Sequence, residues 1–431
     1  MQKTNGIIVV GGGLAGLTAA VMLARANRRV TLFEKAAHVG GRAMTSHEQG
    51  FAFNLGPHAL YAEGAAARTF KELGIQYTAH RPQLGGYALV EGRRETFPSG
   101  ALSLMTTGLF STAEKFEAGQ WLTKLGKLDV SDLHGVTLHD WLESNIRHLR
   151  LRQFLQALAR LTTYAGDAQR QSAAAAIAQM QLGLSSGVRY LDGGWQTLVD
   201  GLREAAVAAG VTIETGQRAQ SIIVEEGVES GRVCGVAMAD GAVCAAESVI
   251  IAASPAEAMA LTESFAPAAW QQQLKDLIPV KAACLDVALA RLPQPNARFG
   301  LGIDQPLYVS VHSATAQLAP SGGALIHVAK YLMTDETTSA KSLEAELEQV
   351  LDATQPGWRD VLVKRRFMPA LTVNHALVTA AMGGRAGRPA VVVPDVAGLF
   401  IAGDWVGAEG QLADASAASA ATAASSILAA S

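Results

Sequence analysis

Apolar residues in the first part of the chain form short uninterrupted runs separated by a helical stretch. Residues 7–10 and 30–34 are such runs, and they are typical of strands buried on both faces of a parallel sheet. The Ala- and Leu-rich stretch between them favours a helix. Strand, helix and strand in this order predict a βαβ unit, so we expect an α/β fold.

The rest of the chain changes character several times. Turns and amphipathic helical patterns dominate residues 81–190, with helices expected at 138–149 and 151–161. Strand-like runs follow from about residue 211. The end of the sequence predicts a strand at 398–404 and an Ala/Ser-rich helix from about 411 onward. Other predicted elements are helices at 64–74, 196–209 and 342–353, and strands at 211–214, 220–225, 233–239, 242–246, 248–253, 282–290 and 324–330.

This order indicates two interleaved domains. We predict a Rossmann-like domain assembled from the discontinuous segments 1–80, 191–275 and 391–431. An α+β domain is expected from segments 81–190 and 276–390, and it would recognise a substrate.

The turn after the first strand carries the glycine spacing of a dinucleotide-binding site. Gly11 permits the tight turn, Gly13 lets the backbone approach a pyrophosphate, and Gly16 lets helix and strand pack closely. The start of the helix would offer N–H groups and a positive dipole end to phosphates. Glu34, at the end of the second strand, would accept a hydrogen bond from a ribose hydroxyl.

Two further motifs extend this prediction. Gly40, Gly41 and Arg42 follow Glu34 closely, and Gly403-Asp404 precedes a helix start near the end of the sequence. Together the three motifs resemble the flavin-dependent amine oxidase, phytoene desaturase and protoporphyrinogen oxidase superfamily, whose members bind FAD. The resemblance is specific in the first 60 and last 35 residues and diffuse between about 85 and 390.

The resemblance implies a set of FAD-binding residues. Arg42 would supply a fixed cation for phosphate or flavin oxygens. The helix that begins near Leu412 and Ala413 would aim its positive end at the N1/C2=O edge of the flavin, and Ala219 would touch the adenine. The full expected set is Gly11, Gly13, Leu14, Ala15, Gly16, Glu34, Lys35, Gly40, Gly41, Arg42, Gly56, Pro57, His58, Ala219, Gly403, Asp404, Leu412 and Ala413.

Composition and charge narrow the class of protein. The 431 residues are 49% hydrophobic and carry a formal net charge of −3, which argues against a nucleic-acid partner. The three cysteines, Cys234, Cys244 and Cys284, have neither disulfide-framework nor metal-ligand spacing, so we expect no metal site. Some monoamine oxidases of the superfamily that this sequence resembles attach the flavin through a cysteine near the C-terminal motif. No cysteine follows Cys284 here, so the resemblance implies that FAD is bound noncovalently.

The sequence has neither a secretory signal pattern nor an apolar run of the roughly 18 residues that span a membrane. We therefore expect a soluble cytoplasmic protein, and a peripheral membrane contact stays compatible with this pattern.

In the superfamily the flavin takes a hydride from a substrate C–H bond, and the protein orients the substrate. Lys281 lies in chain order where amine oxidases carry an active-site lysine, so it is a candidate to hold a water near flavin N5; the alternative is a surface lysine at a strand edge. His58 is the second candidate, near the expected flavin plane, and a structural histidine is the alternative. Further pocket candidates, each also compatible with a core position, are Tyr61, Trp195, Tyr308 and His327.

Two enzymatic interpretations compete. Residues 54–58 and 191–194 resemble bacterial phytoene desaturase-like proteins, which favours a desaturase or dehydrogenase of a small hydrophobic, isoprenoid or polyene-like substrate. Lys281 would instead favour an amine or amino-acid oxidase, although such a site usually needs an aromatic cage and aromatic residues are only 6% of the chain. Protoporphyrinogen oxidation is a third hypothesis, and a flavin-binding scaffold without activity is the non-enzymatic one.

Overall fold

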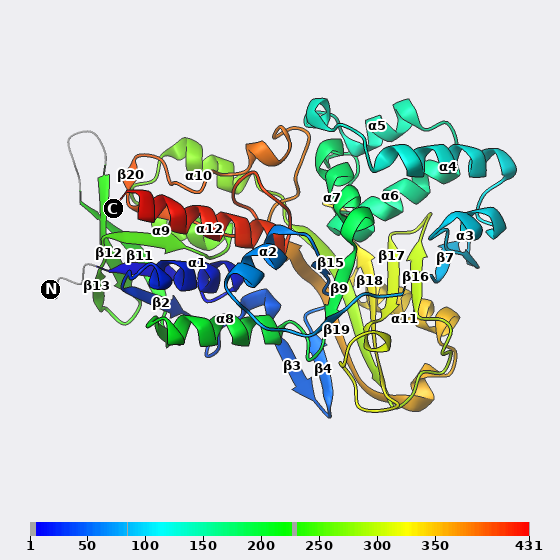
Figure 1. Ribbon diagram of the computed structural model, residues 1–431, viewed down its shortest axis with the longest axis horizontal. Helices are drawn as coiled ribbons and strands as arrows, with labels where there is room; N and C mark the ends of the chain where they lie inside the picture. The colour runs from blue at the N-terminus through cyan, green and yellow to red at the C-terminus, as the bar shows by residue number, and fades with distance from the viewer. Residues whose placement is uncertain (1–5, 84, 226–230, 431) are drawn as a thin grey trace.

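The computed structural model describes residues 6–83, 85–225 and 231–430. Five parallel strands form its first sheet, in the order β10-β2-β1-β14-β21 (Figure 1). All four residues of the central β1 are buried, as expected for a strand covered on both faces. The strands are β1 (Ile7–Val10), β2 (Val30–Glu34), β10 (Thr212–Thr215), β14 (Ser248–Ile251) and β21 (Leu399–Ile401).

Helices from distant parts of the chain cover this sheet. Helix α1 (Leu14–Arg25) packs between α8 (Gln196–Ala208) and α12 (Ala413–Ala429), and α12 also contacts α2 (Ala65–Glu72). The Ala and Ser residues of α12 make these close contacts feasible, since small side chains let helices approach. Beside them lie α9 (Pro255–Thr262), α10 (Ala268–Lys275) and a small sheet of β11 (Ala219–Glu225), β12 (Gly231–Met238), β13 (Val243–Ala245) and β20 (Val396–Ala397).

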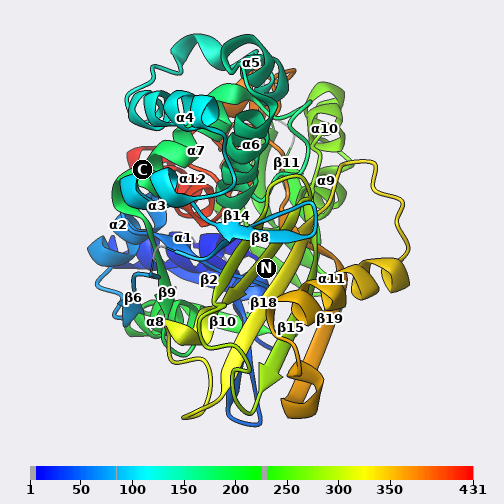
Figure 2. The same ribbon diagram turned by 90° about the vertical axis from the view of Figure 1, so that its right-hand side faces the viewer.

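A second, larger sheet lies beside the first region, and its strand order is β19-β15-β18-β17-β16-β7-β8 (Figures 1 and 2). Its neighbouring strands are antiparallel except for β16 and β7. The strands are β7 (Tyr87–Val90), β8 (Arg93–Thr96), β15 (Val280–Leu289), β16 (Phe299–Gly302), β17 (Leu307–Val311), β18 (Ala324–Tyr331) and β19 (Leu362–Asn374).

The two faces of this sheet are covered differently. Helix α11 (Ala340–Thr354) packs on one face, against side chains such as Leu285 and Val287 of β15. The alternate residues Ala282 and Cys284 belong to a core cluster shared with the helical layer seen above the sheet in Figure 2. That layer contains α3 (Ala101–Thr106), α4 (Thr112–Leu125), α5 (Leu138–Asn145), α6 (Leu149–Thr163) and α7 (Ala173–Ser186).

Short elements join the two sheets. The hairpin of β3 (Thr45–Glu48) and β4 (Phe51–Asn54) packs Phe51 and Phe53 against Tyr190 and Leu325. β9 (Val188–Leu191) pairs with both β5 (Leu60–Tyr61) and β6 (Ala79–His80). The single-turn helices are η1 (Gly41–Ala43), η2 (Ser131–Leu133), η3 (His312–Ala314), η4 (Trp358–Val361) and η5 (Gly384–Gly387).

The elements agree with most sequence predictions in type, and they differ in bounds. The predicted helix 138–149 ends at Asn145 because Ile146 adopts an extended conformation, and the next helix already starts at Leu149. Segments 81–190 and 276–390 share the larger sheet through β7 and β16. The domain boundaries stay a prediction, since the hairpin of segment 1–80 packs on that sheet as well. Among the described residues we find no helix with the length and apolarity needed to cross a bilayer.

Candidate active site

A cavity of about 850 Å³ opens where the carboxyl ends of β1, β2, β14 and β21 meet. In open α/β sheets this is the edge at which ligands bind. Of the predicted FAD-binding residues, those that line it are Gly11, Gly13, Leu14, Ala15, Glu34, Lys35, Gly40, Gly41, Arg42, Pro57, His58, Ala219, Gly403, Asp404, Leu412 and Ala413. Gly16 and Gly56 lie outside this lining.

The three glycines of the first turn have separate structural tasks. Gly11 has a φ of +109°, and a Cβ there would lie 2.5 Å from the carbonyl oxygen of Ala252. A Cβ on Gly16 would lie 1.9 Å from the carbonyl oxygen of Gly11, so Gly16 sets the approach of helix to turn. At Gly13 a Cβ would meet nothing within 4 Å. The missing side chain of Gly13 therefore leaves room beside the cavity, as a backbone cradle for a pyrophosphate requires.

The N-terminus of α1 is available to an anion. Its N-cap residue, Gly13, makes no side-chain capping bond, and its first turn contains no acidic residue. The amide groups at this end carry the positive end of the helix dipole. Residues present here thus fit a phosphate ligand.

Glu34 has a role that the sequence did not predict. One carboxylate oxygen accepts a 2.7 Å hydrogen bond from the backbone N–H of Gly12, and the other accepts one of 2.8 Å from Ala36. Glu34 therefore holds the glycine turn in place through its hydrogen bond to the backbone of Gly12. Because each carboxylate oxygen has a second lone pair, the predicted bond to a ribose hydroxyl is still feasible.

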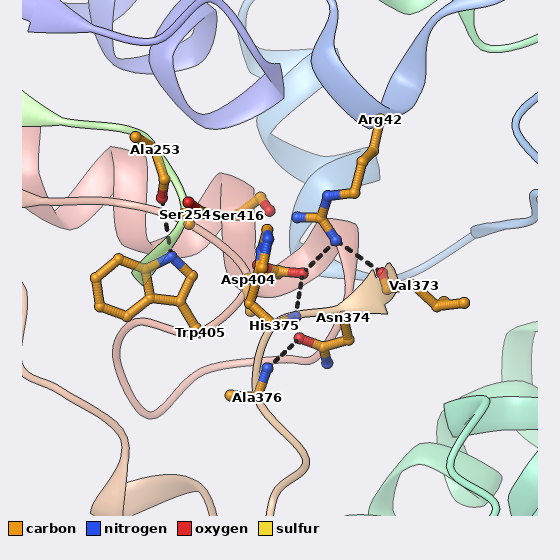
Figure 3. Close-up of polar contacts among 12 residues, drawn as sticks. Arg42, Ala253, Ser254, Val373, Asn374, His375, Ala376, Asp404, Trp405 and Ser416 are labelled. Atoms are coloured by element: carbon orange, nitrogen blue, oxygen red, sulfur yellow. Dashed lines mark hydrogen bonds and ion pairs between the residues drawn. The ribbon is translucent and has the colours of Figure 1, made fainter. Parts of the chain in front are cut away.

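Arg42 and Asp404 join the second glycine motif to the C-terminal one (Figure 3). Nη1 of Arg42 donates to Oδ2 of Asp404 at 2.7 Å and to the carbonyl oxygen of Val373 at 2.8 Å. His375 contacts the same carboxylate through its backbone N–H and through Nδ1, at 3.1 and 3.0 Å. Burial raises the pKa of Asp404, but Arg42 and His375 outweigh burial and hold that pKa well below its usual range. Asp404 is therefore a fixed anion that orients Arg42 toward the cavity.

The start of α12 lies at the same cavity, as predicted from Leu412 and Ala413. Leu412, its N-cap residue, has a φ of +56°, a strained conformation for a branched side chain. Asp414 follows in the first turn and is buried. Its Oδ1 accepts a hydrogen bond from Ala66 at the start of α2, so it caps a second helix. Burial raises the pKa of Asp414 to about 6.

The end of the cavity beyond Arg42 is lined by aromatic and apolar side chains. His58 and Trp195 pack edge to face with ring centroids 4.9 Å apart. Tyr164 donates a hydrogen bond from its hydroxyl to the carbonyl oxygen of Pro57, and Tyr61 donates to Thr162. Apolar neighbours in the lining are Leu55, Leu60, Leu371 and Val373, together with the buried thiol of Cys284, whose pKa burial raises well above its usual value.

Lys281 is not among the residues that line this cavity. It is exposed on β15, and its backbone carbonyl accepts a bond from Leu332. Side chains alternate along a strand, and Lys281 falls on the face of Ala283, which packs toward α11, whereas Cys284 faces the cavity. The described geometry therefore supports the surface-lysine alternative.

The other pocket candidates divide between lining and core. Tyr61 and Trp195 line the cavity, whereas Tyr308 and His327 are buried outside it. Within the described ranges, no group of three His, Cys, Asp or Glu side chains is placed to hold a metal ion.

Four further residues that were not predicted from the sequence also line the cavity: Tyr164, Cys284, His375 and Asp414. Asp414 had a local signal, since an acid in the first turn of a predicted helix faces the positive dipole end. The other three had none, because strand and helix ends far apart in sequence bring them to the cavity.

Comparison with known proteins agrees with this geometry. The sequence model of the family described as flavin containing amine oxidoreductase matches residues 14–428. A 4,4'-diaponeurosporene oxygenase of Staphylococcus aureus is 26% identical over 283 residues, which cover 57% of this chain and 55% of that protein. The match thus spans about half the length of this curated relative.

Solved structures share the fold over nearly the whole chain. An oxidoreductase from Methanosarcina mazei has a TM-score of 0.78 and 21% identity, covering 97% of this chain and 99% of that one. A putative protoporphyrinogen oxidase from Exiguobacterium sp. 255-15 has a TM-score of 0.75 and 18% identity, with both chains covered completely. At sequence identities this low, the similarity to these structures shows a shared fold and nothing about activity.

Proposed function

Because the chain belongs to the flavin containing amine oxidoreductase family and is an FAD-dependent oxidoreductase, we propose that it oxidises a C–H bond of a hydrophobic, isoprenoid or polyene-like substrate. The observation that carries this proposal is the apolar lining of the cavity beyond Arg42, with Leu55, Leu60, Leu371 and Val373. Apolar walls favour a hydrophobic ligand because its burial removes apolar surface from water. The name of the diaponeurosporene oxygenase relative is consistent with such a substrate.

The residues present fit FAD along the polar part of the cavity. The free N-terminus of α1 and the open side of Gly13 would take the pyrophosphate, and Glu34 the adenosine ribose. Arg42, held by Asp404, would face the flavin oxygens. When bound, the flavin supplies the two-electron oxidation. We propose noncovalent attachment, since Cys284 is the one cysteine in the described lining and its thiol is buried and held protonated.

Other residues at this end would orient the substrate and exclude water. Tyr164 closes one side through its bond to Pro57, and Trp195 packs against His58. These contacts fix aromatic rings at the place where substrate and flavin would meet, so they limit the poses that a substrate can adopt.

A second function is favoured by the aromatic rings themselves. Tyr61, Tyr164 and Trp195 line one end of the cavity although aromatic residues are scarce in the chain. Rings of this kind bind cationic groups through their faces, so an amine substrate is the alternative. The family name is consistent with it.

Anaerobic reduction of the flavin tests both functions. The purified holoprotein would be mixed with polyenes, primary amines and porphyrinogens, and bleaching of the flavin absorbance followed by stopped flow. Bleaching by polyenes with recovery in the presence of an oxidant supports the first proposal. Bleaching by amines alone would replace it with the second. A flavin that no member of the panel reduces would favour a scaffold.

Noncovalent attachment has its own test. Acid precipitation followed by chromatography of the supernatant should recover all FAD, and yellow colour retained in the pellet would contradict that part of the proposal.

A further inference from the structure

The open end of the β3–β4 hairpin lies beside the start of α8 (Figure 1). Thr45 and Asn54 occupy this end and face each other across the hairpin. Both are buried, and the hydroxyl of Thr45 donates a 2.7 Å hydrogen bond to Oδ1 of Asn54. Two polar side chains buried at the junction of a hairpin and a helix need partners there.

These two side chains cap α8. The first N–H groups of a helix have no partner within the helix itself. Oδ1 of Asn54 accepts a 2.9 Å bond from the backbone N–H of Trp195, and Oγ1 of Thr45 accepts a 3.0 Å bond from that of Gln196. Trp195 is the N-cap residue of α8, and its own side chain makes no capping bond. The cap of this helix is therefore supplied by the hairpin.

Gly194 leaves the space that this arrangement needs. A Cβ at Gly194 would lie 2.6 Å from Oγ1 of Thr45 and 2.7 Å from Oδ1 of Asn54. Its φ of +82° also lies in the region that favours glycine. The cap thus joins the two stretches 54–58 and 191–194, which both carry the resemblance to phytoene desaturase-like proteins.

Trp195 connects this cap to the cavity. Its indole lines the cavity and packs edge to face against the imidazole of His58, with ring centroids 4.9 Å apart. A buried indole N–H usually has a hydrogen-bond partner. Nε1 of Trp195 is buried and has none among the described residues. Because the ring is not fixed by a hydrogen bond of its own, its position depends on the Trp195 backbone and on packing.

Arg366 holds Asn54 from the larger sheet. Its Nη2 donates to the backbone carbonyl oxygen of Asn54 and, at 2.8 Å, to Oδ2 of Asp286, while its guanidinium lies 5.2 Å from the ring centre of Phe53. Arg366 belongs to a row of polar side chains on neighbouring strands. In this row Arg366 on β19 faces Asp286 on β15, and Asp286 faces His327 on β18. Asn54 is therefore held through its backbone by the larger sheet and through its side chain by α8.

We propose that Asn54 is a positioning residue, which fixes the indole of Trp195 in the cavity wall and so limits the poses of the substrate beside the flavin. The inference rests on the proposed function. Asn54 is not among the residues that line the cavity, so it acts through Trp195. A displacement of about 1 Å caused by a change away from the reacting atoms can cost on the order of 100-fold in rate.

Two substitutions of Asn54 separate this role from packing. Asn54→Leu keeps a side chain of similar size without an acceptor, so Trp195 loses the bond that fixes its backbone. Asn54→Asp keeps acceptors for both Trp195 and Thr45, and its charge would lie at the positive end of α8. Thr137→Val is the matched control, because Thr137 caps α5 in the same way and lies outside the cavity lining.

Proton–carbon NMR of the holoprotein measures the position of the ring without any substrate. The ring current of Trp195 displaces the ring-proton resonances of His58, which are identified by their absence from His58→Gln. We expect these resonances to move toward those of an exposed histidine in Asn54→Leu. They should keep the wild-type positions in Asn54→Asp and in Thr137→Val. Unmoved resonances in folded Asn54→Leu would overturn the proposal.

The rate of anaerobic flavin reduction measures the consequence for the substrate. With the member of the panel that bleaches the flavin, the rate at saturation should be at least about tenfold lower in Asn54→Leu. Asn54→Asp should recover it, and the FAD content should be the same in all variants. A wild-type rate in Asn54→Leu would overturn the proposal, and so would an equal loss in Thr137→Val or no recovery in Asn54→Asp.

Should Asn54→Leu not fold, Thr45→Val takes its place, because it removes only the hydroxyl that links Asn54 to Gln196. The resonances of His58 must then move in the same direction, and unmoved resonances would reject the proposal. If no member of the panel reduces the flavin, the proposed function fails, while the NMR result still decides whether Asn54 positions Trp195.

Discussion

The two sheets place their polar groups in different ways. In the parallel region, the site is made mainly by backbone: a glycine turn, the start of α1 and the start of α12. In the larger sheet the buried polar groups are side chains instead. Arg366, Asp286 and His327 lie opposite one another on the neighbouring strands β19, β15 and β18. Backbone sites depend on the space that glycines leave, whereas side-chain sites depend on mutual charge compensation. The two regions should therefore respond to different kinds of substitution.

The largest effect is expected in the glycine turn. Gly16→Val would drive a side chain into the carbonyl of Gly11, so we expect a loss of about 5 kcal/mol or no folded protein. Gly13→Ala is the matched variant, because its Cβ meets no protein atom within 4 Å. It should keep the melting temperature of the apoprotein and bind FAD at least about tenfold more weakly. Thermal unfolding measures the melting temperature, and titration with FAD measures the affinity. A Gly13→Ala variant that binds FAD as tightly as wild type would contradict the role of Gly13 as a backbone cradle for the pyrophosphate.

In the larger sheet, replacing only Asp286 should destabilise the protein more than replacing Asp286, Arg366 and His327 together. Asp286→Asn leaves Arg366 and His327 without their counter-ion, and we expect a loss of about 3 kcal/mol. The triple variant Asp286→Leu, Arg366→Met, His327→Phe should recover part of this loss, since apolar groups need no compensation. Urea unfolding of wild type, Asp286→Asn and the triple variant measures their free energies of unfolding. A triple variant less stable than Asp286→Asn would show that the row also holds the strands in register.

A smaller effect, with a definite pH dependence, is expected at the start of α12. The folded-state pKa of Asp414 is about 6, above its usual value of 3.8, so its stabilising contribution is complete below pH 3.8 and lost as pH rises through 6. Asp414→Asn should thus be more stable than wild type by about 3 kcal/mol at pH 8, and equal to it near pH 3.5. Melting curves at both pH values measure this. Glu263→Gln, which removes an exposed carboxylate that is not among the causes of the Asp414 shift, is the control. A gain in Asp414→Asn that does not depend on pH would refute the assignment.

The smallest effect concerns Lys281. Because its side chain is exposed on the face away from the cavity, Lys281→Met should change stability by less than about 0.5 kcal/mol. Flavin content and the rate of anaerobic flavin reduction should also stay at the wild-type values. A markedly slower reduction in this variant would mean that β15 presents the other face to the substrate.

The contrast between the regions also explains what the sequence could predict. Gly11, Gly13, Gly16 and Glu34 lie within one short segment, so their spacing carries a local signal, and the structure places all but Gly16 at the cavity. The facing positions of Asp286, His327 and Arg366 depend on strand register, which no local pattern specifies. For the same reason the sequence left Lys281 open between a site residue and a surface lysine, since a position in chain order does not say which face of a strand a side chain occupies.

The assembly of the first sheet from distant segments has a consequence for synthesis. β21 and α12 complete that sheet and supply Gly403, Asp404 and Ala413 to the cavity, yet they leave the ribosome hundreds of residues after β1. At about 5–20 residues per second, the glycine turn waits on the order of tens of seconds for these partners. During that interval the growing chain has an exposed edge at β14 and an incomplete flavin cradle. The cavity lining is therefore complete only after β21 and α12 have been synthesised.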